Sequence, residues 1–270
     1  MKILKLVRNM HKRIKVKLRL WKPAGVNLTI LHDDVFLVSY PKSGNTWVRF
    51  LLGQARLARS LDFASIEYVI PDIYQNSDRE LLRASKPRVL KSHEMYTELY
   101  PRVIYLVRDP RDVAISFYYW REKTGSCKIE GLHINLADYL HHYFSEKELY
   151  FSGWGEHVES WVEQTSFLGD RLLTLRYEDI EQSPKKVLQR VVGFLGWDTS
   201  DSVMDFSVKY SAANRMRKAE DVLSESQKQQ IPFVREARSG QWKEVFDGKL
   251  NAIYWERFGK WMEKFDYTKF

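Results

Sequence analysis

Residues 40–47 read Tyr-Pro-Lys-Ser-Gly-Asn-Thr-Trp and lie between a predicted strand and a predicted helix. The run before them, Val-Phe-Leu-Val at 35–38, is short, apolar and rich in β-branched residues, which is typical of a buried parallel strand. After them, apolar residues recur at helical spacing as far as residue 55. We therefore expect a strand–loop–helix corner whose backbone N–H groups and helix dipole bind a phosphate or a sulfate.

The side chains of this corner also suit an anion. Lys42 supplies a positive charge, and Ser43, Asn45 and Thr46 supply hydrogen-bond donors. The common nucleotide-triphosphate loop, G-x-x-x-x-G-K-[ST], has its Lys after the second Gly. Here Lys42 precedes Gly44, the only Gly of the segment, so a P-loop nucleotide kinase or phosphotransferase is the less favoured alternative. A helix-capping turn without a ligand is the other alternative.

A second strand–loop–helix corner follows at 102–117. Arg108 comes directly after the apolar run 102–107, and Ser116 lies eight residues further on, in the next predicted helix. Because open α/β sheets bind ligands at the carboxyl ends of their strands, Arg108 and Ser116 are candidate ligands of a phosphate monoester. The alternative is a structural ion pair between Arg108 and Asp112.

The predicted strand at 88–93 ends in Lys91-Ser92-His93. An imidazole with a pKa near neutrality suits a general base that takes a proton from a hydroxyl group. A purely structural role is the alternative for a single His at the end of a strand.

These segments, in this order, resemble the cytosolic-type sulfotransferases, which use 3′-phosphoadenosine 5′-phosphosulfate (PAPS). The matching patterns are Tyr-Pro-Lys-Ser-Gly-x-Thr-Trp at 40–47, Lys-Ser-His at 91–93 and Arg-x-x-Arg-Asp-x-x-x-Ser at 108–116. Weaker matches are Tyr-Glu-Asp at 177–179, Ser211 with Met216, and a closing loop at 235–243. The resemblance covers roughly residues 33–265.

The resemblance implies a role for each matching residue. The 5′-phosphosulfate would be bound by Lys42, Ser43, Gly44, Asn45, Thr46 and Trp47. The rest of the nucleotide would be bound by Arg108, Ser116 and Arg235 at the 3′-phosphate, Tyr177 at the adenine, Ser211 and Met216. His93 would take the acceptor proton, Lys42 would stabilise the leaving phosphate oxygen, and Lys91 would assist or orient. The product would be adenosine 3′,5′-bisphosphate (PAP), and no metal would be required.

The sequence departs from the family pattern at the nucleotide end. Ala213 stands where the family usually has a Phe that stacks on the adenine, although Trp47 is still available to cover one face. In the closing loop Glu236 and Ala237 replace a Lys-Gly pair, and Arg238 is the nearest cation that would compensate.

The order of strands and helices predicts the architecture. Strand-like runs at 88–93, 102–107 and 171–177 alternate with helical stretches, and one late helix is marked by Ser183, Pro184 and a final Gly196. We expect a single α/β domain at 28–270, with a mostly parallel central sheet flanked by helices and a P-loop-like phosphosulfate-binding loop, after a basic arm at 1–27.

The net charge of +8 belongs to this arm. Residues 1–22 contain nine of the 43 Lys and Arg residues and no acid, which leaves 34 basic and 35 acidic residues in the remainder. A nucleic-acid-binding body is therefore not supported. The arm is either a basic amphipathic helix on anionic lipid, a helix packed loosely on the domain, or a disordered segment.

Cysteine usage and hydropathy bear on location. The single Cys127 excludes an internal disulfide, and no apolar run approaches the length of a membrane span. We expect a cytoplasmic enzyme, either peripheral to a membrane through residues 1–22 or not, and the oligomeric state stays open.

The acceptor is expected to be a small aromatic, hydrophobic or lipid-like molecule, because aromatic residues gather at 117–120 and 139–161. Within them Phe144, Tyr150, Phe151 and Trp154 are candidates for the pocket wall, but for any single one of them filling of the core is favoured. The polar stretch 122–153 is expected to form a lid.

Overall fold

The structure is a computed structural model that describes residues 28–129, 132–142, 151–221 and 236–269. Its centre is a four-stranded sheet with the order β2-β1-β3-β6, in which all neighbouring strands are parallel. The strands are β1 Val35–Ser39, β2 Val89–Ser92, β3 Arg102–Val107 and β6 Leu172–Arg176. A separate antiparallel pair is formed by β4 Lys128–Ile129 and β5 Leu132–His133. The predicted α/β fold with a mostly parallel sheet is confirmed.

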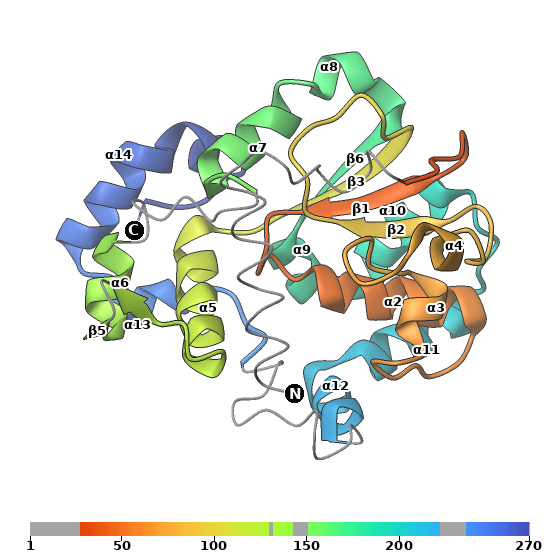
Figure 1. Cartoon of the computed structure of the whole chain (residues 1–270), viewed down its shortest axis with the longest axis horizontal. Coiled ribbons are helices and arrows are strands. Elements are labelled where there is room, and N and C mark those ends of the chain that lie inside the picture. The colour runs from red at the N-terminus through yellow and green to blue at the C-terminus, as the bar shows by residue number, and fades with distance from the viewer. Residues whose placement is uncertain (1–27, 130–131, 143–150, 222–235, 270) are drawn as a thin grey trace.

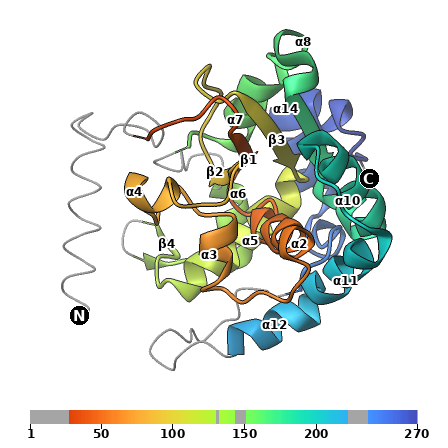
Figure 2. The ribbon, with the colours of Figure 1, turned by 90° about the vertical axis from the view of Figure 1, so that its right-hand side faces the viewer.

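Helices cover both faces of this sheet (Figures 1 and 2). The longer ones are α2 Asn45–Leu57, α5 Pro110–Lys123, α7 Trp154–Val162, α10 Pro184–Leu195, α11 Asp201–Ser211, α12 Ala213–Asp221 and α14 Gly248–Lys264. The shorter ones are α3 Ile66–Val69, α4 Asp78–Leu81, α6 Leu136–His142, α8 Thr165–Leu168, the 3₁₀ helix η2 Gly169–Arg171, α9 Tyr177–Gln182 and α13 Trp242–Val245.

Successive side chains of a strand point to opposite faces of the sheet, which divides the core into two clusters, one on each face. On β1, Val35 and Leu37 join α2, α10 and α11, whereas Phe36 and Val38 join α5, α7 and α14. The two central strands, β1 and β3, are buried almost throughout because helices cover both faces, which explains why they read as continuous apolar runs; the edge strand β6 is mostly half-buried.

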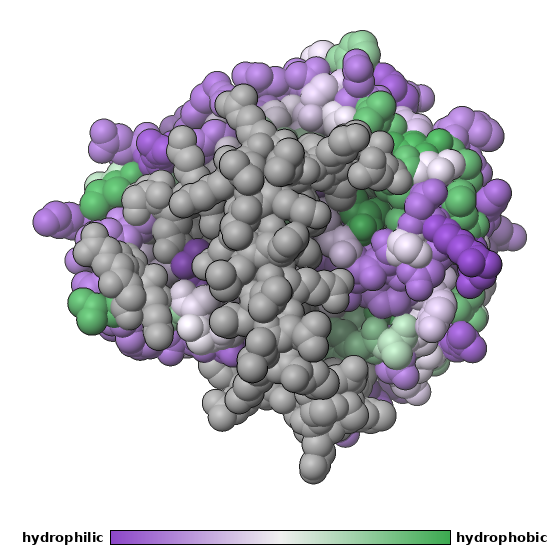
Figure 3. Space-filling view, viewed as in Figure 1, coloured by the Kyte–Doolittle hydropathy of each residue, from purple (hydrophilic) through white to green (hydrophobic). Residues whose placement is uncertain are grey.

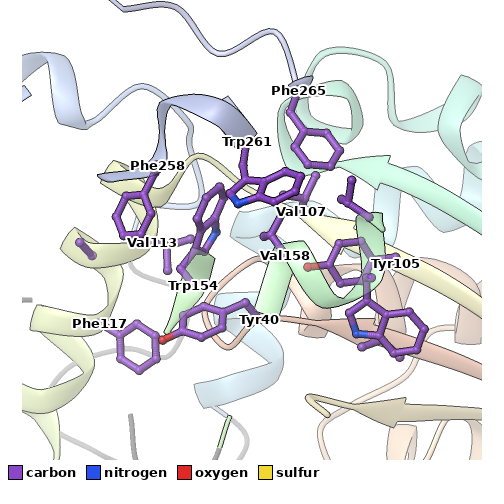
Figure 4. Packing of buried hydrophobic residues seen from close by; sticks show 14 of the residues in the cluster. Tyr40, Tyr105, Val107, Val113, Phe117, Trp154, Val158, Phe258, Trp261 and Phe265 are labelled. Carbon is purple, nitrogen blue, oxygen red and sulfur yellow. The ribbon is translucent and has the colours of Figure 1, made fainter. Parts of the chain in front are cut away.

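The cluster on the α7 and α14 side is rich in aromatic rings. Figure 4 shows the indole of Trp154 beside the ring of Phe258. The indole of Trp161 stacks on the ring of Tyr105, a residue of β3. This packing fixes α7 against the carboxyl ends of the strands, where the candidate site lies.

The helix predicted after Ser183 is present as α10. It begins at Pro184 and ends before Gly196, whose φ of 68° is left-handed. Ser183 occupies the N-cap position, but its side chain makes no capping hydrogen bond.

Among the described residues, no helix is both long and apolar enough to span a bilayer. On the face seen in Figure 3, the described residues that are not covered are largely hydrophilic, with the main hydrophobic patch at the upper right of the view. The predicted basic arm at 1–27 lies outside the described residues, and so do Arg235, Phe144 and Tyr150.

Candidate functional site

Three predicted site residues lie at the carboxyl ends of three adjacent strands. The 40–47 loop follows β1, His93 follows β2 and Arg108 follows β3. Nη1 of Arg108 donates to the carbonyl oxygen of Lys42 at 3.2 Å, and Nδ1 of His93 lies 2.7 Å from the carbonyl oxygen of Ser39. The parallel sheet therefore brings residues from distant parts of the sequence to a single edge.

The 40–47 loop turns tightly into α2. Lys42 and Gly44 have left-handed φ values of 70° and 97°, and α2 begins at Asn45. The side chains of Ser43 and Asn45 are buried, and neither Oγ of Ser43 nor Oδ1 of Asn45 has a hydrogen-bond partner within the described part of the chain. A buried hydroxyl next to a helix N-terminus is a donor suited to an anion.

Lys42 is held in a strongly basic environment. Burial, together with the charges of Lys123, Arg108 and Lys91, lowers its pKa to about 7. A bound phosphate or sulfate would favour the ammonium form, because an opposite charge nearby raises the pKa of a Lys.

His93 is fixed by its neighbours in one tautomer. Because a carbonyl oxygen only accepts, Nδ1 of His93 carries the proton that is donated to Ser39, and in the neutral ring Nε2 has the lone pair. Its backbone N–H donates to the hydroxyl of Tyr74 at 2.8 Å. Burial, reinforced by the charge of Lys91, lowers the pKa of His93 to about 3, well below the near-neutral value on which its candidacy as a general base was based. The ring is therefore neutral at physiological pH.

Two aromatic rings lie beside this imidazole. The ring of Tyr74 is nearly parallel to it, with centroids 6.1 Å apart, and the ring of half-buried Phe151 meets it edge-on at 5.5 Å. These rings give the His93 side of the site an apolar wall.

Lys91 is engaged in an ion pair. Its Nζ lies 2.5 Å from Oδ2 of the buried Asp72, which also accepts from the backbone N–H of Tyr74. Burial lowers the pKa of Lys91, while the Asp72 carboxylate opposes this shift. The charge of Lys91 thus reaches the site from a fixed position on β2.

Arg108 connects the two loops of the site. Besides Lys42, it donates through Nη2 to the carbonyl oxygen of Arg238 at 2.9 Å, and its guanidinium lies 4.2 Å from the ring centre of Tyr177. Asp112 is 4.0 Å away, so the ion pair considered from the sequence exists but is long. Nε of Arg108 is buried and lacks a partner among the described residues, which leaves a donor for an anion.

The remaining nucleotide candidates differ in accessibility. Tyr177 is buried beside Trp47, with the two rings edge to face at 5.5 Å. Ser211 and Met216 are buried too, and the hydroxyl of Ser211 donates to the carbonyl oxygen of Val208. Ser116 is half-buried on α5.

Asp112 and Glu181 anchor the closing loop, and sequence reasoning missed both as functional residues. Asp112 accepts from the backbone N–H groups of Gly240 at 2.7 Å and Trp242 at 3.1 Å. Oε2 of Glu181 accepts from the backbone N–H and the hydroxyl of Ser239. The only sequence signal was that Asp112 lies within the 108–116 pattern.

Arg238 is already paired. Its guanidinium bonds to the carboxylates of Glu236 and Glu244 at 2.7 to 2.8 Å. The cation expected to compensate for the altered closing loop is therefore neutralised by two neighbours.

Trp154 fills the core, the favoured alternative for any single one of the candidate aromatic residues, and does not line an acceptor pocket. This side chain is 1% exposed, packs on Phe258 and donates its indole N–H to the carbonyl oxygen of Arg108. The indole lies on the face of α7 that packs against the core, and removing its large apolar surface from water stabilises the fold. Phe151, by contrast, is half-buried and lies beside His93.

Chemically, the site combines cations, buried donors and a neutral imidazole at one edge of the sheet. Within the described ranges, no three His, Cys, Asp or Glu side chains are grouped so that they would hold a metal ion. The orphaned donors of Ser43 and Arg108 fit a ligand with anionic groups at two positions.

Comparisons with known proteins point to one family. A sulfotransferase domain model matches residues 32–266. Sulfotransferase 1 family member D1 of Rattus norvegicus is 29% identical over 258 residues, which cover 86% of this chain and 84% of that protein. Sulfotransferase 2B1 of Mus musculus is 27% identical over 261 residues, covering 87% and 75% of the two chains.

Solved structures share the fold. Mouse sulfotransferase SULT7A1 complexed with PAP aligns with a TM-score of 0.66 and 24% identity, over 87% of this chain and 85% of that one. Retinol dehydratase in a complex with retinol and PAP aligns with a TM-score of 0.63 and 20% identity, over 88% and 82%.

Proposed function

The chain belongs to the sulfotransferase domain family, and on that basis we propose that it transfers the sulfuryl group of PAPS to a hydroxyl or amine group of a small aromatic or hydrophobic acceptor. The observation that carries the proposal is the meeting of Lys42, His93 and Arg108 at the ends of three adjacent strands. The kinase alternative is not favoured, because the family match covers the whole region of the site.

The donor would be held at both of its phosphate ends. The 40–47 loop, with its helix N-terminus and the buried Ser43 hydroxyl, suits the 5′-phosphosulfate. Arg108, together with Ser116 and Arg235, is assigned to the 3′-phosphate. In support, two structural neighbours were solved in complex with PAP, which is the product that this reaction would leave.

In the proposed step, a bond forms between the acceptor oxygen and sulfur while the bond from sulfur to the 5′-phosphate oxygen breaks. The acceptor proton passes to Nε2 of His93, which the Nδ1–Ser39 bond leaves as the basic nitrogen. Lys42 stabilises the negative charge on the departing phosphate, and Lys91 adds to the positive potential. These residues mainly position the reactants and balance charge, as in phosphoryl transfer.

The acceptor would bind on the side of Tyr74 and Phe151. Their rings flank His93 at 6.1 and 5.5 Å, which favours an acceptor with an apolar or aromatic body next to the reacting group. Retinol, named with one structural neighbour, is a hydrophobic alcohol of this kind.

We also propose that residues 28–270 form the catalytic domain of a cytoplasmic enzyme, and that the basic segment 1–22 contacts anionic lipid. Removing residues 1–27 should then leave turnover in solution unchanged and abolish binding to phosphatidylserine vesicles. Equal vesicle binding by the full and the shortened chain would refute the lipid contact.

The transfer itself is tested by incubating the full chain with ³⁵S-labelled PAPS and a panel of phenols, aliphatic alcohols and amines, beginning with 2-naphthol. Label should appear in an organic sulfate ester, and PAP should inhibit. Binding of ATP with magnesium in preference to PAP would overturn the proposal.

A further inference from the structure

Helix α7 presents three ring N–H groups to backbone carbonyls of the site. Nε1 of Trp154 donates to Arg108 at 3.2 Å, Nε2 of His157 to His93 at 3.2 Å, and Nε1 of Trp161 to Glu94 at 3.0 Å. The spacing of three and then four residues places the donors on one face of the helix. All three side chains are at most 1% exposed, and Figure 4 shows the indole of Trp154 within the core.

The carbonyls that accept these bonds lie just beyond the sheet. Strand β2 ends at Ser92 and β3 at Val107, so residues 93, 94 and 108 are no longer paired in the ladder. A buried carbonyl without a donor is costly, and here the donors come from α7. The helix therefore fixes the backbone where the proposed base and the proposed 3′-phosphate ligand leave their strands.

His157 is itself held in one tautomer. Because the carbonyl of His93 only accepts, Nε2 of His157 carries the proton, and Nδ1 accepts from the hydroxyl of Tyr105 at 3.1 Å. The ring stacks on Tyr105 and meets the ring of Tyr40, the first residue of the 40–47 loop, edge-on at 5.6 Å. Burial lowers the pKa of His157 to about 4, so the ring stays neutral.

We propose that His157 is a positioning residue for His93, and that Trp154 plays the matching part for Arg108. This inference rests on the proposed function, in which His93 is the base. In this proposal two donors on one face of α7 have different effects. His157 acts on the chemical step through His93, and Trp154 acts on nucleotide binding through Arg108.

The contacts of His93 show how a change at His157 would alter the position of the His93 ring. Three bonds fix this residue: its N–H to Tyr74, its Nδ1–H to Ser39, and its carbonyl from His157. Without the third bond, the peptide after His93 is released and the direction of Nε2 is no longer set. A misplacement of about 1 Å in a reacting group costs up to roughly 100-fold in rate.

The test compares His157→Leu, His157→Gln and Trp154→Phe in the full chain. Turnover is measured with the best acceptor of the phenol panel, and Kd is measured for PAP by calorimetry. His157→Leu should lower kcat by about 10- to 100-fold, with the Kd for PAP within about twofold of wild type. His157→Gln retains an amide donor at the position of Nε2 and should recover part of kcat. Trp154→Phe should instead raise the Kd for PAP by about three- to tenfold, the loss of one hydrogen bond.

Three results would overturn the inference. The first is an unchanged kcat in His157→Leu, and the second is no recovery of kcat in His157→Gln. The third is that His157→Leu and Trp154→Phe lower kcat and PAP affinity to the same extent, as a general loss of packing would. If His157→Leu does not fold, Tyr105→Phe removes only the hydroxyl donor to Nδ1; it should lower kcat without changing the Kd for PAP, and an unchanged kcat would count against the inference.

The proposed function can fail separately. If His93→Gln keeps full turnover, His93 is not the base, whatever α7 does. The ¹⁵N shifts of the His93 ring give a readout that needs no turnover: they should report a proton on Nδ1 in the wild type and a mixed tautomer in His157→Leu. Identical ring shifts in the two proteins would refute the positioning role even if both are active.

Discussion

A Cβ atom on Gly44 would lie 2.5 Å from Cδ2 of Tyr177, so the phenol ring packs directly against the backbone of the 40–47 loop. No real Cβ contact is this short. Because Tyr177 is also buried under the guanidinium of Arg108, the ring has little room to retreat. The loop, the strand end at Arg108 and the start of α9 are thus packed as one unit.

Gly44→Ala should therefore be strongly destabilising and should abolish PAP binding. It adds left-handed strain, at a φ of 97°, to a steric overlap with a buried ring. Strain costs about 1 kcal/mol and overpacking about 1–3 kcal/mol more, which urea unfolding would measure.

Gly196→Ala is the matched control for this change. Gly196 is also left-handed, at a φ of 68°, but a Cβ there meets nothing within 4 Å. Gly196→Ala should lower the free energy of unfolding only by the backbone strain, about 1 kcal/mol, and should bind PAP normally. Equal losses of stability in the two variants would show that contact with Tyr177 does not matter.

His93→Gln should reduce kcat by about 100- to 10,000-fold, the usual contribution of a general base, and leave the Kd for PAP unchanged. Because the pKa of His93 is lowered to about 3, the ring is already in its basic, neutral form at pH 5. The wild-type rate should therefore show no acidic limb from this group between pH 5 and pH 7. A parallel fall in PAP affinity would argue for a binding role instead.

The positions of residues that directly follow a strand could be predicted from the sequence, because parallel strands align their carboxyl ends. The 40–47 loop, His93 and Arg108 were placed in this way. The sequence was not sufficient for contacts between distant segments: Asp112 meets Gly240 128 residues away, and His157 meets His93 64 residues away. Nothing local marks such partners. Which of the candidate aromatic residues fill the core, as Trp154 does, could not be told, because an aromatic residue that lines a pocket and one that fills a core look alike in sequence.

Lys42→Arg should change how PAP binding depends on pH. The pKa of Lys42 is lowered to about 7, so in the unliganded protein its ammonium is progressively lost above neutrality. A bound anion raises that pKa, and between the two values binding takes up a proton. Kd for PAP should then rise from pH 7 to pH 9, by at most about tenfold per unit.

Arg keeps its charge over this range, so the variant should bind PAP with nearly constant Kd above pH 7. The Lys42→Arg variant is also a control for the phosphates of PAP, because any pH dependence that comes from their titration appears in both proteins. Calorimetry in buffers of different ionisation enthalpy should find proton uptake at pH 8 in the wild type only. The same uptake in both proteins would contradict the role given to Lys42.

Asp112→Asn should loosen the closing loop. The Asp112 carboxylate uses both oxygens, one for the N–H of Gly240 and one for that of Trp242, whereas Asn would turn an amide donor toward one of them. The cost of leaving a buried donor unpaired is about 1–3 kcal/mol. Glu181→Gln is the control, since Glu181 contacts Ser239 through one oxygen only and Gln can replace it. Equal unfolding free energies of Asp112→Asn and wild type would refute this view of the loop.

Glu178→Gln should stabilise the protein at alkaline but not at acidic pH. Glu178 accepts from the backbone N–H of Asp109 and the hydroxyl of Tyr267, and burial raises its pKa from 4.5 to about 7. Between these values the folded chain holds a proton that the unfolded chain has lost, so the contribution of this group to stability falls as pH rises from 4.5 to 7. Above pH 7 the buried carboxylate costs at most about 3 kcal/mol, which Gln avoids. Urea unfolding at pH 5 and pH 8 should show a gain at pH 8 that largely disappears at pH 5, and an equal gain at both would place the effect in packing, not in ionisation.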